Sequence, residues 1–416
     1  MIRRDIDIAV IGGGAAGLAA AIKAKEAGIK DVVILDRNEE LGGILPQCIH
    51  TGFGLHHFKE NLTGPEYIST FIKRAQDLQI ECKLETMVLK ITPNKEILAV
   101  NSVDGLLTLR AKAIVLAMGC REKTRGALCI PGTRPAGIYT AGTAQRLMDI
   151  EGYMPGRDVV ILGSGDVGLI MARRFAMEGA SVKAVVEAMP YPGGLTRNVV
   201  QCLEDFGIPL LLERTITFIH GHDRVEAVTI SKVDAEGNTV PGVEEKIMCD
   251  TLVLSVGLIP ENELSEDAGI VLDSTTGGPV VNERMETSIP GIFACGNVVT
   301  VYDLVDYVSR VGELAGESAA RYVLNELPPL RREIALKSGD NVRSVVPQII
   351  GGERPVTLYI RAKKPMRNVE VRIQNLRFPE RVVRPPEMIV IELTEERLMK
   401  LEKKPVLLVS MEEVAR

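Results

Sequence analysis

The sequence predicts an α/β protein with two βαβ units and a small all-β domain at its C-terminal end. Residues 6–36 and 158–187 share one pattern: a short β-branched run, a glycine-rich turn, a helix-period stretch, a second β-branched run and an acid. After Pro328 and Pro329 the pattern changes to short strand-like runs between Pro, Gly and charged turns. These three observations define the expected fold class.

Composition excludes several classes of protein. The chain has 416 residues, of which 46% are hydrophobic and 25% charged, as in soluble proteins of more than one domain. A net charge of −6 argues against a general nucleic-acid binder. Asp5, Asp7 and several glycines interrupt the apolar N-terminal stretch, so we expect neither a signal peptide nor an integral membrane segment. A cytoplasmic location is therefore expected.

Seven cysteines are scattered along the chain, and no two form a CxxC pair. Their spacing excludes a thioredoxin-like local dithiol, a zinc knuckle and the usual iron–sulfur ligand runs. We expect most of them to be small buried side chains in a reducing compartment.

The first glycine-rich turn is Gly12-x-Gly14-x-x-Gly17, placed between a predicted strand and a predicted helix. Such a turn lets the backbone approach a pyrophosphate at the helix N-terminus. Asp36 ends the second strand, 19 residues after Gly17, where a carboxylate can accept both ribose hydroxyls. The spacing predicts a Rossmann-like dinucleotide site; the alternative is a merely glycine-rich turn.

The second turn is Gly163-x-Gly165-x-x-Gly168, with Glu187 also 19 residues after the last glycine. A carboxylate at this position repels a 2′-phosphate, and the nearest downstream arginine, Arg197, is ten residues further on. NADH is therefore favoured over NADPH. The alternative is that this domain binds another adenine nucleotide, or none.

Further motifs follow in a recognisable order. They are the double glycine after Leu41, the runs AIVLAMG and TLVLSVG, and the segment TSIPGIFACGN that ends at Asn297. On these motifs, over roughly residues 5–325, the sequence resembles the pyridine nucleotide–disulfide oxidoreductase superfamily. The resemblance implies an FAD-binding domain (1–122 and 254–330), an inserted NAD-binding domain (123–253) and a separate C-terminal β-rich domain (331–416). It also implies hydride transfer between nicotinamide and flavin.

The glycine turns and the resemblance together give the expected cofactor-binding residues. For FAD they are Gly12, Gly14, Ala15, Ala16, Gly17, Asp36, Arg37, Gly42, Gly43, Ile44, Val88, Ala117, Gly119, Gly296, Asn297 and Leu304; for NADH they are Gly163, Gly165, Asp166, Val167, Gly168, Glu187 and Gly257. Asn297 stands where the family has an aspartate, and its amide still donates and accepts hydrogen bonds. By analogy, the start of a helix near residues 303–306 stabilises the reduced flavin through its dipole.

The sequence departs from the superfamily in its redox cysteines. The stretch after the double glycine, ILPQCIHTGFG, holds only Cys48, and the second family position, IYTAGTAQ, holds none. An ordinary thioredoxin or glutathione reductase mechanism is therefore not expected. Cys48 and His50 are candidate catalytic residues, as a redox thiol and its proton partner. The alternatives are a cysteine packed beside the cofactor and a structural histidine. No metal site is expected.

The segments GGILPQCIHTGFG, GCREKTRG, AGIYTAGTAQRLMD and ACGNVVTVYDLVDYVS resemble a narrower group. Its members are oxidoreductase subunits that work beside an FAD-dependent glycerol-3-phosphate dehydrogenase. The resemblance implies a partner flavoprotein dehydrogenase, a small-molecule electron acceptor and an oligomer. The C-terminal domain has no cysteine, so it cannot hold a ferredoxin-like [2Fe–2S] cluster, whose iron ions are bound by cysteines. Its 18 Lys+Arg against 12 Asp+Glu indicate either a docking surface or an ordinary solvated one.

The expected function is that of an FAD-dependent NADH:acceptor oxidoreductase. One alternative is an NADH oxidase, peroxidase or disulfide reductase that uses Cys48. Another is a non-catalytic scaffold protein that holds nucleotides only to stay folded.

Overall fold

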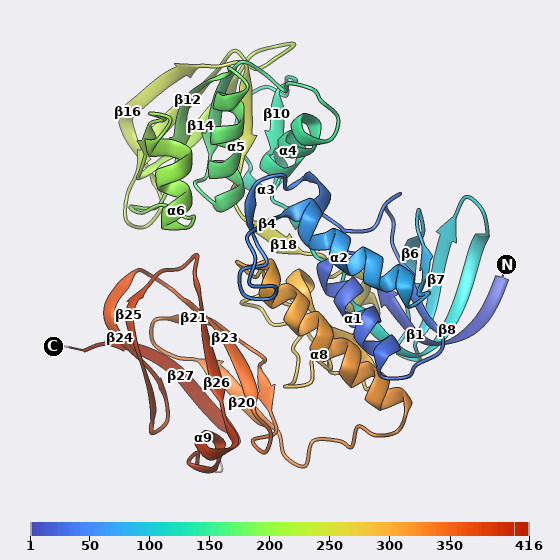
Figure 1. Ribbon diagram of the computed structural model, residues 1–416. Helices are drawn as coiled ribbons and strands as arrows, with labels where there is room; N and C mark the ends of the chain where they lie inside the picture. The colour runs from blue at the N-terminus through green and yellow to red at the C-terminus, as the bar shows by residue number, and fades with distance from the viewer. Residues whose placement is uncertain (1, 403, 415–416) are drawn as a thin grey trace. The chain divides into compact units, whose positions relative to one another are not determined.

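The computed structural model describes residues 2–402 and 404–414 (Figure 1). It divides into two compact units, Met1–Cys120 with Pro260–Arg416, and Arg121–Ile259. Each unit contains one of the glycine-rich turns, and the second unit is inserted into the chain of the first. The predicted α/β class, with one Rossmann-like domain inserted in another, is confirmed.

A seven-stranded mixed sheet forms the base of the first unit, in the order β5-β2-β1-β8-β7-β6 with β19 also paired to β8. Ile8 of the central strand β1 lies opposite Val32 and Ala113, and Phe293 lies opposite Val115. Because β1, β8 and β19 are parallel, their carboxyl ends meet at one edge, where ligands of such sheets bind. The strands are β1 (Ile2–Ile11), β2 (Val32–Leu35), β5 (Glu81–Lys83), β6 (Met87–Ile91), β7 (Glu96–Asn101), β8 (Gly105–Leu116) and β19 (Ile292–Ala294).

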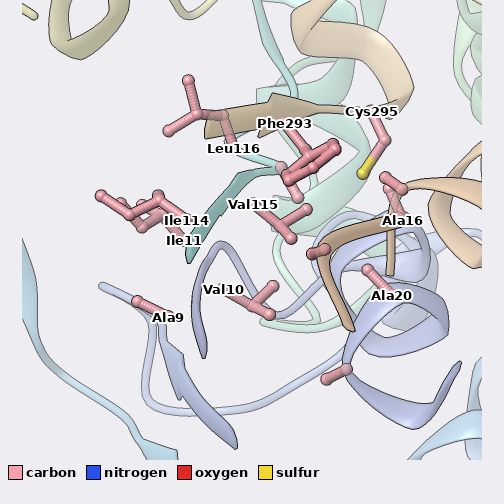
Figure 2. Packing of buried hydrophobic residues seen from close by; sticks show 14 of the residues in the cluster. Ala9, Val10, Ile11, Ala16, Ala20, Ile114, Val115, Leu116, Phe293 and Cys295 are labelled. Carbon is pink, nitrogen blue, oxygen red and sulfur yellow. The ribbon is translucent and has the colours of Figure 1, made fainter. Parts of the chain in front are cut away.

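Helices α1 (Ala15–Glu26) and α8 (Val305–Val323) lie side by side on this sheet (Figure 1). A Cβ atom on Gly312 would lie 2.4 Å from the Ala16 carbonyl oxygen, so only glycine allows the helices to come this close. Figure 2 shows Ala16 and Ala20 of α1 with Cys295 and Phe293 in the same core. The remaining elements are η1 (Leu45–Gln47), β3 (Thr51–Phe53), β4 (Leu62–Thr63), α2 (Gly64–Asp77), α7 (Glu263–Asp267) and η3 (Gly296–Val298).

The second unit has a five-stranded parallel sheet in the order β10-β17-β11-β12-β13 and an antiparallel sheet β14-β15-β16. Val160 of β11 lies opposite Ala184 and Leu252, all buried. Its strands are β9 (Cys120–Glu122), which pairs with β18 (Leu258–Pro260), β10 (Ile138–Thr140), β11 (Asp158–Leu162), β12 (Ser181–Val186), β13 (Leu210–Leu211), β14 (Arg214–His220), β15 (Ala227–Val233), β16 (Thr239–Met248) and β17 (Thr251–Leu254). Its helical segments are α3 (Arg125–Leu128), α4 (Ala141–Asp149), α5 (Asp166–Met177), α6 (Thr196–Val199) and η2 (Val200–Glu204).

The C-terminal domain packs two sheets, β22-β20-β27-β24-β25 and β21-β23-β26, around one apolar core. It is a β-sandwich with one short helix, α9 (Glu395–Met399), which the all-β prediction lacked. The strands are β20 (Ile334–Ser338), β21 (Val342–Val346), β22 (Ile349–Ile350), β23 (Val356–Ala362), β24 (Met366–Ile373), β25 (Leu376–Val383), β26 (Met388–Leu393) and β27 (Val406–Glu413).

Several predicted elements are close to the observed ones. The helix start expected near residues 303–306 is that of α8, and the N-terminus of α2 is fixed by a capping box between Thr63 and Glu66. Among the described residues, no helix is both long enough and apolar enough to cross a membrane.

Candidate nucleotide-binding sites

The first glycine turn connects β1 to α1, and two of its glycines are required for packing. Gly12 has φ +103°, and a Cβ atom on it would lie 2.3 Å from the Ala117 carbonyl oxygen. A Cβ atom on Gly17 would lie 1.8 Å from the Gly12 carbonyl oxygen. Any larger residue at either position would push β1, β8 and α1 apart.

Gly14 and Gly43 lie against each other in front of α1. Gly14 is the N-cap residue of the helix, and the nearest atom to a Cβ on it would be the Gly43 Cα, 3.7 Å away. The double-glycine loop is held there because the Gly42 amide donates to the Gly13 carbonyl at 2.9 Å. Free amide groups at a helix start without acids in its first turn attract an anion. We call the start of α1 together with Gly14 and Gly43 the FAD cradle, because it fits the diphosphate of a dinucleotide such as FAD.

Asp36 lies beside the turn, with its side chain bonded to the backbone. The residue is 6% exposed, and its two carboxylate oxygens accept from the Gly13 amide at 2.6 Å and from the Asn38 amide at 2.8 Å. Arg37 is more exposed and lies 3.9 Å from Glu261. Each Asp36 oxygen keeps a lone pair for a ribose hydroxyl.

The segment that contains Gly296 contacts the first turn of α1. A Cβ atom on Gly296 would lie 2.8 Å from the Ala16 Cβ. The Asn297 side chain accepts from the Tyr302 amide at 3.0 Å and donates to the Cys120 sulfur at 3.5 Å. Its amide therefore orders its own loop, a role that the motif alone does not reveal.

The structure places the other predicted FAD residues as follows. Ala15 and Ala16 are buried in the first turn of α1, Ala117 follows β8, and Val88 is buried in β6, so that its backbone alone can face a ligand. Ile44, beside Gly43, is 59% exposed, Gly119 has φ +73°, and Leu304 is the N-cap residue of α8.

Cys48 and His50 lie in the loop after the double glycine. The Cys48 sulfur donates to the Ile44 carbonyl at 3.4 Å, and a Cβ atom on Gly64 would lie 2.8 Å from the Cys48 Cβ. The His50 Nδ1 lies 3.2 Å from the Thr51 carbonyl oxygen. These contacts place both side chains in a packed loop next to the cradle.

Asp306 is a functional candidate that the sequence motifs do not reveal. It is 4% exposed in the first turn of α8, and its carboxylate accepts from the amides of Gly54, His56 and His57 at 3.3, 3.0 and 2.7 Å. It therefore attaches the loop after His50 to the start of α8. An acid in the first turn of a predicted helix was the only sequence signal, because its partners lie about 250 residues away.

The second glycine turn repeats the first between β11 and α5. Gly163 has φ +95°, and a Cβ atom on it would lie 2.0 Å from the Ser255 carbonyl oxygen. Glu187 is 9% exposed; its Oε2 accepts from the Ser164 amide at 2.9 Å and hydroxyl at 2.6 Å, and its Oε1 accepts from the Met189 amide at 2.9 Å. The carboxylate is fixed beside the turn, as Asp36 is in the first unit.

The rest of the second site has an additional loop. Gly165 is the N-cap residue of α5, and a Cβ atom on Gly168 would lie 2.6 Å from the Ser255 Cβ. The Asp166 carboxylate accepts from the Leu195 amide at 2.8 Å and from the Asn198 side chain at 2.6 Å. Residues 193–198 are thereby attached to the start of α5. Val167 is 36% exposed on α5, and Gly257, with φ +100°, follows β17.

The cysteines are less buried than expected. Cys202, Cys249 and Cys295 are buried, and burial raises the pKa of Cys249 and of Cys295 to about 12. Cys48, Cys82 and Cys120 are half-buried, and Cys129 is exposed. The expectation that most would be buried was wrong, because Cys48 and Cys129 lie at the ends of short surface helices and Cys82 and Cys120 lie in short, half-buried strands. In the described part of the chain, no group of three or more metal-ligating side chains could hold a metal ion.

Two Rossmann-like domains, each with a glycine turn and a buried carboxylate, define the class of proteins that bind two dinucleotides. The family model of the pyridine nucleotide-disulphide oxidoreductases matches residues 6–315. The chain belongs to this family of FAD- and NAD(P)-dependent oxidoreductases.

Comparison with known proteins gives distant relatives. One of the subunits of opine oxidase from Agrobacterium tumefaciens is 24% identical over 77% of this chain and 66% of its own length. The CoA-dependent NAD(P)H sulfur oxidoreductase of Pyrococcus abyssi is 27% identical over 70% of this chain and 62% of its own length. The crystal structure of T. acidophilum thioredoxin reductase superposes with a TM-score of 0.63 and 26% identity, over 76% of this chain and 98% of that one. The chain thus spans less than two thirds of the lengths of these two curated relatives.

Proposed function

We propose that the chain is an FAD-dependent NAD(P)H:acceptor oxidoreductase and that NADH is its preferred reductant. The observation that carries the proposal is the repeated geometry of the two glycine turns. Each turn starts its helix at a glycine N-cap that has no side-chain cap, and each has a buried acid bonded to its own backbone, Asp36 to Gly13 and Glu187 to Ser164. That arrangement suits the diphosphate and ribose of a dinucleotide.

When bound, the two cofactors supply hydride exchange between nicotinamide and flavin. The residues of the chain bind and orient them. The amides at the start of α1 and α5 would hold the two diphosphates, and Asp36 and Glu187 would accept hydrogen bonds from the adenosine riboses. Positioning of this kind lowers the activation barrier, because the reacting groups are already held close together and correctly oriented.

The preference for NADH rests on Glu187. Its carboxylate is 9% exposed, and its Oε1 accepts from the Met189 amide, which leaves a lone pair on that oxygen for a ribose hydroxyl. A 2′-phosphate at that place would bring a second negative charge beside a poorly solvated carboxylate, which is unfavourable.

The proposed electron acceptor is supported by the sequence, which has no CxxC pair. Without neighbouring thiols, electrons have no local disulfide through which to leave. We therefore propose a small-molecule acceptor or a partner flavoprotein dehydrogenase, such as the glycerol-3-phosphate enzyme of the narrower resemblance. One distant relative, from opine oxidase, is named as one subunit of its enzyme, which supports work within a complex.

Anaerobic stopped-flow mixing tests the proposal. The chain is loaded with FAD and mixed with NADH or NADPH while the flavin absorbance near 450 nm is followed. We expect bleaching at catalytic rates, about 1 s⁻¹ or faster, and more quickly with NADH. A flavin that stays oxidised with both nucleotides would contradict the proposal and favour the scaffold alternative.

The partner is tested by purification of the untagged protein from its native source. We expect a flavoprotein dehydrogenase to co-elute and its substrate to reduce the flavin of this chain. The proposal of a partner dehydrogenase would be contradicted if the chain elutes alone and receives no electrons from an added glycerol-3-phosphate dehydrogenase.

A further inference from the structure

Within the first unit, the C-terminal β-sandwich contacts a short segment, residues 301–307, which leads into α8. The Arg361 guanidinium, on β23, joins the two. Its Nη1 donates to the carbonyls of Pro385 and Pro386 at 2.7 and 2.8 Å, and its Nη2 donates to the Val301 carbonyl at 2.8 Å. One planar group therefore fixes a turn of the sandwich and the segment at the same time.

A second bond and a group of aromatic rings reinforce this contact. The Asp303 carboxylate accepts from the Met388 amide, at the start of β26, at 2.8 Å. The Tyr359 ring, also on β23, lies edge-on to Tyr302 with centroids 5.1 Å apart, and 5.5 Å from Tyr307. Tyr359 and Tyr302 are 4% and 6% exposed, so the rings form a desolvated contact.

The same segment continues directly into the FAD cradle. The Tyr302 amide donates to the Asn297 side chain at 3.0 Å, and a Cβ atom on Gly296 would lie 2.8 Å from the Ala16 Cβ in the first turn of α1. A chain of contacts therefore runs from Tyr359 through Tyr302 and Asn297 to the glycine turn. The same segment also includes Leu304, the N-cap residue of α8, whose apolar side chain cannot accept a hydrogen bond from the first amides of that helix.

We infer that the C-terminal sandwich is part of the FAD site, and that Arg361 and Tyr359 are positioning residues for it. They hold residues 296–305, and with them the start of α8, against the first turn of α1. This inference rests on the proposed function, because FAD is the ligand concerned.

The simpler explanation is that these contacts only join two domains. The same boundary has a second set of contacts that does not touch residues 296–305. The Gln348 side chain accepts from the Val281 amide at 3.0 Å, and the Glu283 carboxylate accepts from the Gly351 amide at 2.6 Å. Gln348→Ala is therefore a matched control, since it breaks a buried bond between the same domains.

The experiment measures the rate of FAD release from loaded full-length protein, by the rise of flavin fluorescence after dilution, together with the visible circular dichroism of the bound flavin. We expect Arg361→Ala to release FAD about tenfold faster and to change the dichroism. Gln348→Ala and the exposed control Arg381→Ala should remain within about twofold of the wild type. Tyr359→Leu, which keeps an apolar side chain, should resemble Arg361→Ala and decides the matter if the latter does not fold.

Two results would overturn the inference. In the first, Arg361→Ala and Tyr359→Leu melt at a lower temperature but release FAD at the wild-type rate with an unchanged spectrum. In the second, Gln348→Ala accelerates release as much as they do. A wild-type chain that cannot be loaded with FAD would instead refute the proposed function itself, and the inference with it.

Discussion

At the scale of single residues, the two acids that end the second strands have the same local geometry. Asp36 accepts from the amide two residues later, Asn38, and from the glycine turn; Glu187 does the same with Met189 and Ser164. Each carboxylate is therefore held before any ligand binds. Such preorganisation lowers the ordering cost of binding, and it explains why the same acid position recurs in both units.

Glu187→Gln should weaken the preference for NADH. The amide oxygen still accepts from the Ser164 backbone, but the charge is lost, and a hydrogen bond to a charged group is worth about 1.5–3 kcal/mol. We expect the KM for NADH to rise roughly tenfold and the ratio of kcat/KM for NADH over NADPH to fall. Steady-state dye reduction with both nucleotides measures this. Glu236→Gln, an exposed acid in the same unit, is the control; an unchanged ratio would show that Glu187 has only a structural role.

Cys48→Ser should leave NADH:dye activity within about twofold of the wild type. The thiol donates to the Ile44 carbonyl at 3.4 Å, and a serine hydroxyl can make the same bond. A loss of peroxide or disulfide reduction with dye activity kept would instead support the single-cysteine alternative. Turnover with NADH and hydrogen peroxide, measured beside dye reduction, separates the two.

The sequence predicts the residues of each glycine turn because their spacing reflects backbone geometry within about 30 residues. It does not predict Asp306, whose carboxylate accepts from the amides of His56 and His57. Nor does it predict Arg361, whose guanidinium donates to the Val301 carbonyl. Those partners are separated by 249 and 60 residues, and no local pattern records them. Long-range hydrogen bonds to backbone atoms leave little trace in composition or periodicity.

At the scale of elements, α1 and α8 form the central helix pair of the first unit. Gly312 and Gly316 of α8 face the backbone carbonyls of Ala16 and Ala20. Without Cβ atoms at these two positions, the α8 backbone contacts α1 directly, and α8 begins close to the FAD cradle.

Gly316→Ala should destabilise the first unit and weaken FAD binding. The added Cβ atom would lie 2.0 Å from the Ala20 carbonyl oxygen, which is backbone and cannot rotate away. Overpacking of this kind costs about 1–3 kcal/mol, measurable by urea unfolding. Gly126→Ala is the control, because its Cβ atom would meet nothing closer than 3.7 Å and alanine favours helix. Equal stability of both variants would show that α8 moves freely relative to α1.

The elements themselves were predictable where strands alternate or run apolar. The run VTLYIRA is β23, MIVIEL is β26, and VEVRI lies within β24. The attachment of residues 193–198 to the start of α5 was not predictable. The sequence places Asp166 at the start of the helix, but it does not show that the Asp166 carboxylate accepts from Leu195 and Asn198, about 30 residues further on. Periodicity identifies the elements, whereas polar side chains in loops determine how the loops fold back.

At the scale of the whole molecule, the division into units suggests how the chain unfolds. The C-terminal sandwich has its own apolar core, yet Val346 and Tyr359 belong to the core of the first unit. Bonds from Gln348, Glu283 and Arg361 cross the same boundary. Shared core residues and buried bonds couple the unfolding of two domains.

A single tryptophan can test that coupling, because the natural chain has none. Phe378 in the sandwich lies under the Arg397 guanidinium at 5.0 Å, so Phe378→Trp keeps an aromatic ring at this site. We expect the tryptophan fluorescence to change in the same transition that releases FAD. Free FAD at 100 times its Kd should raise the free energy of unfolding in that transition by about 2.7 kcal/mol. ADP-ribose, which carries the adenosine half of NADH, should stabilise a separate transition of the inserted unit. A tryptophan transition that ignores FAD would show that the sandwich unfolds alone, and would separate it from the flavin site.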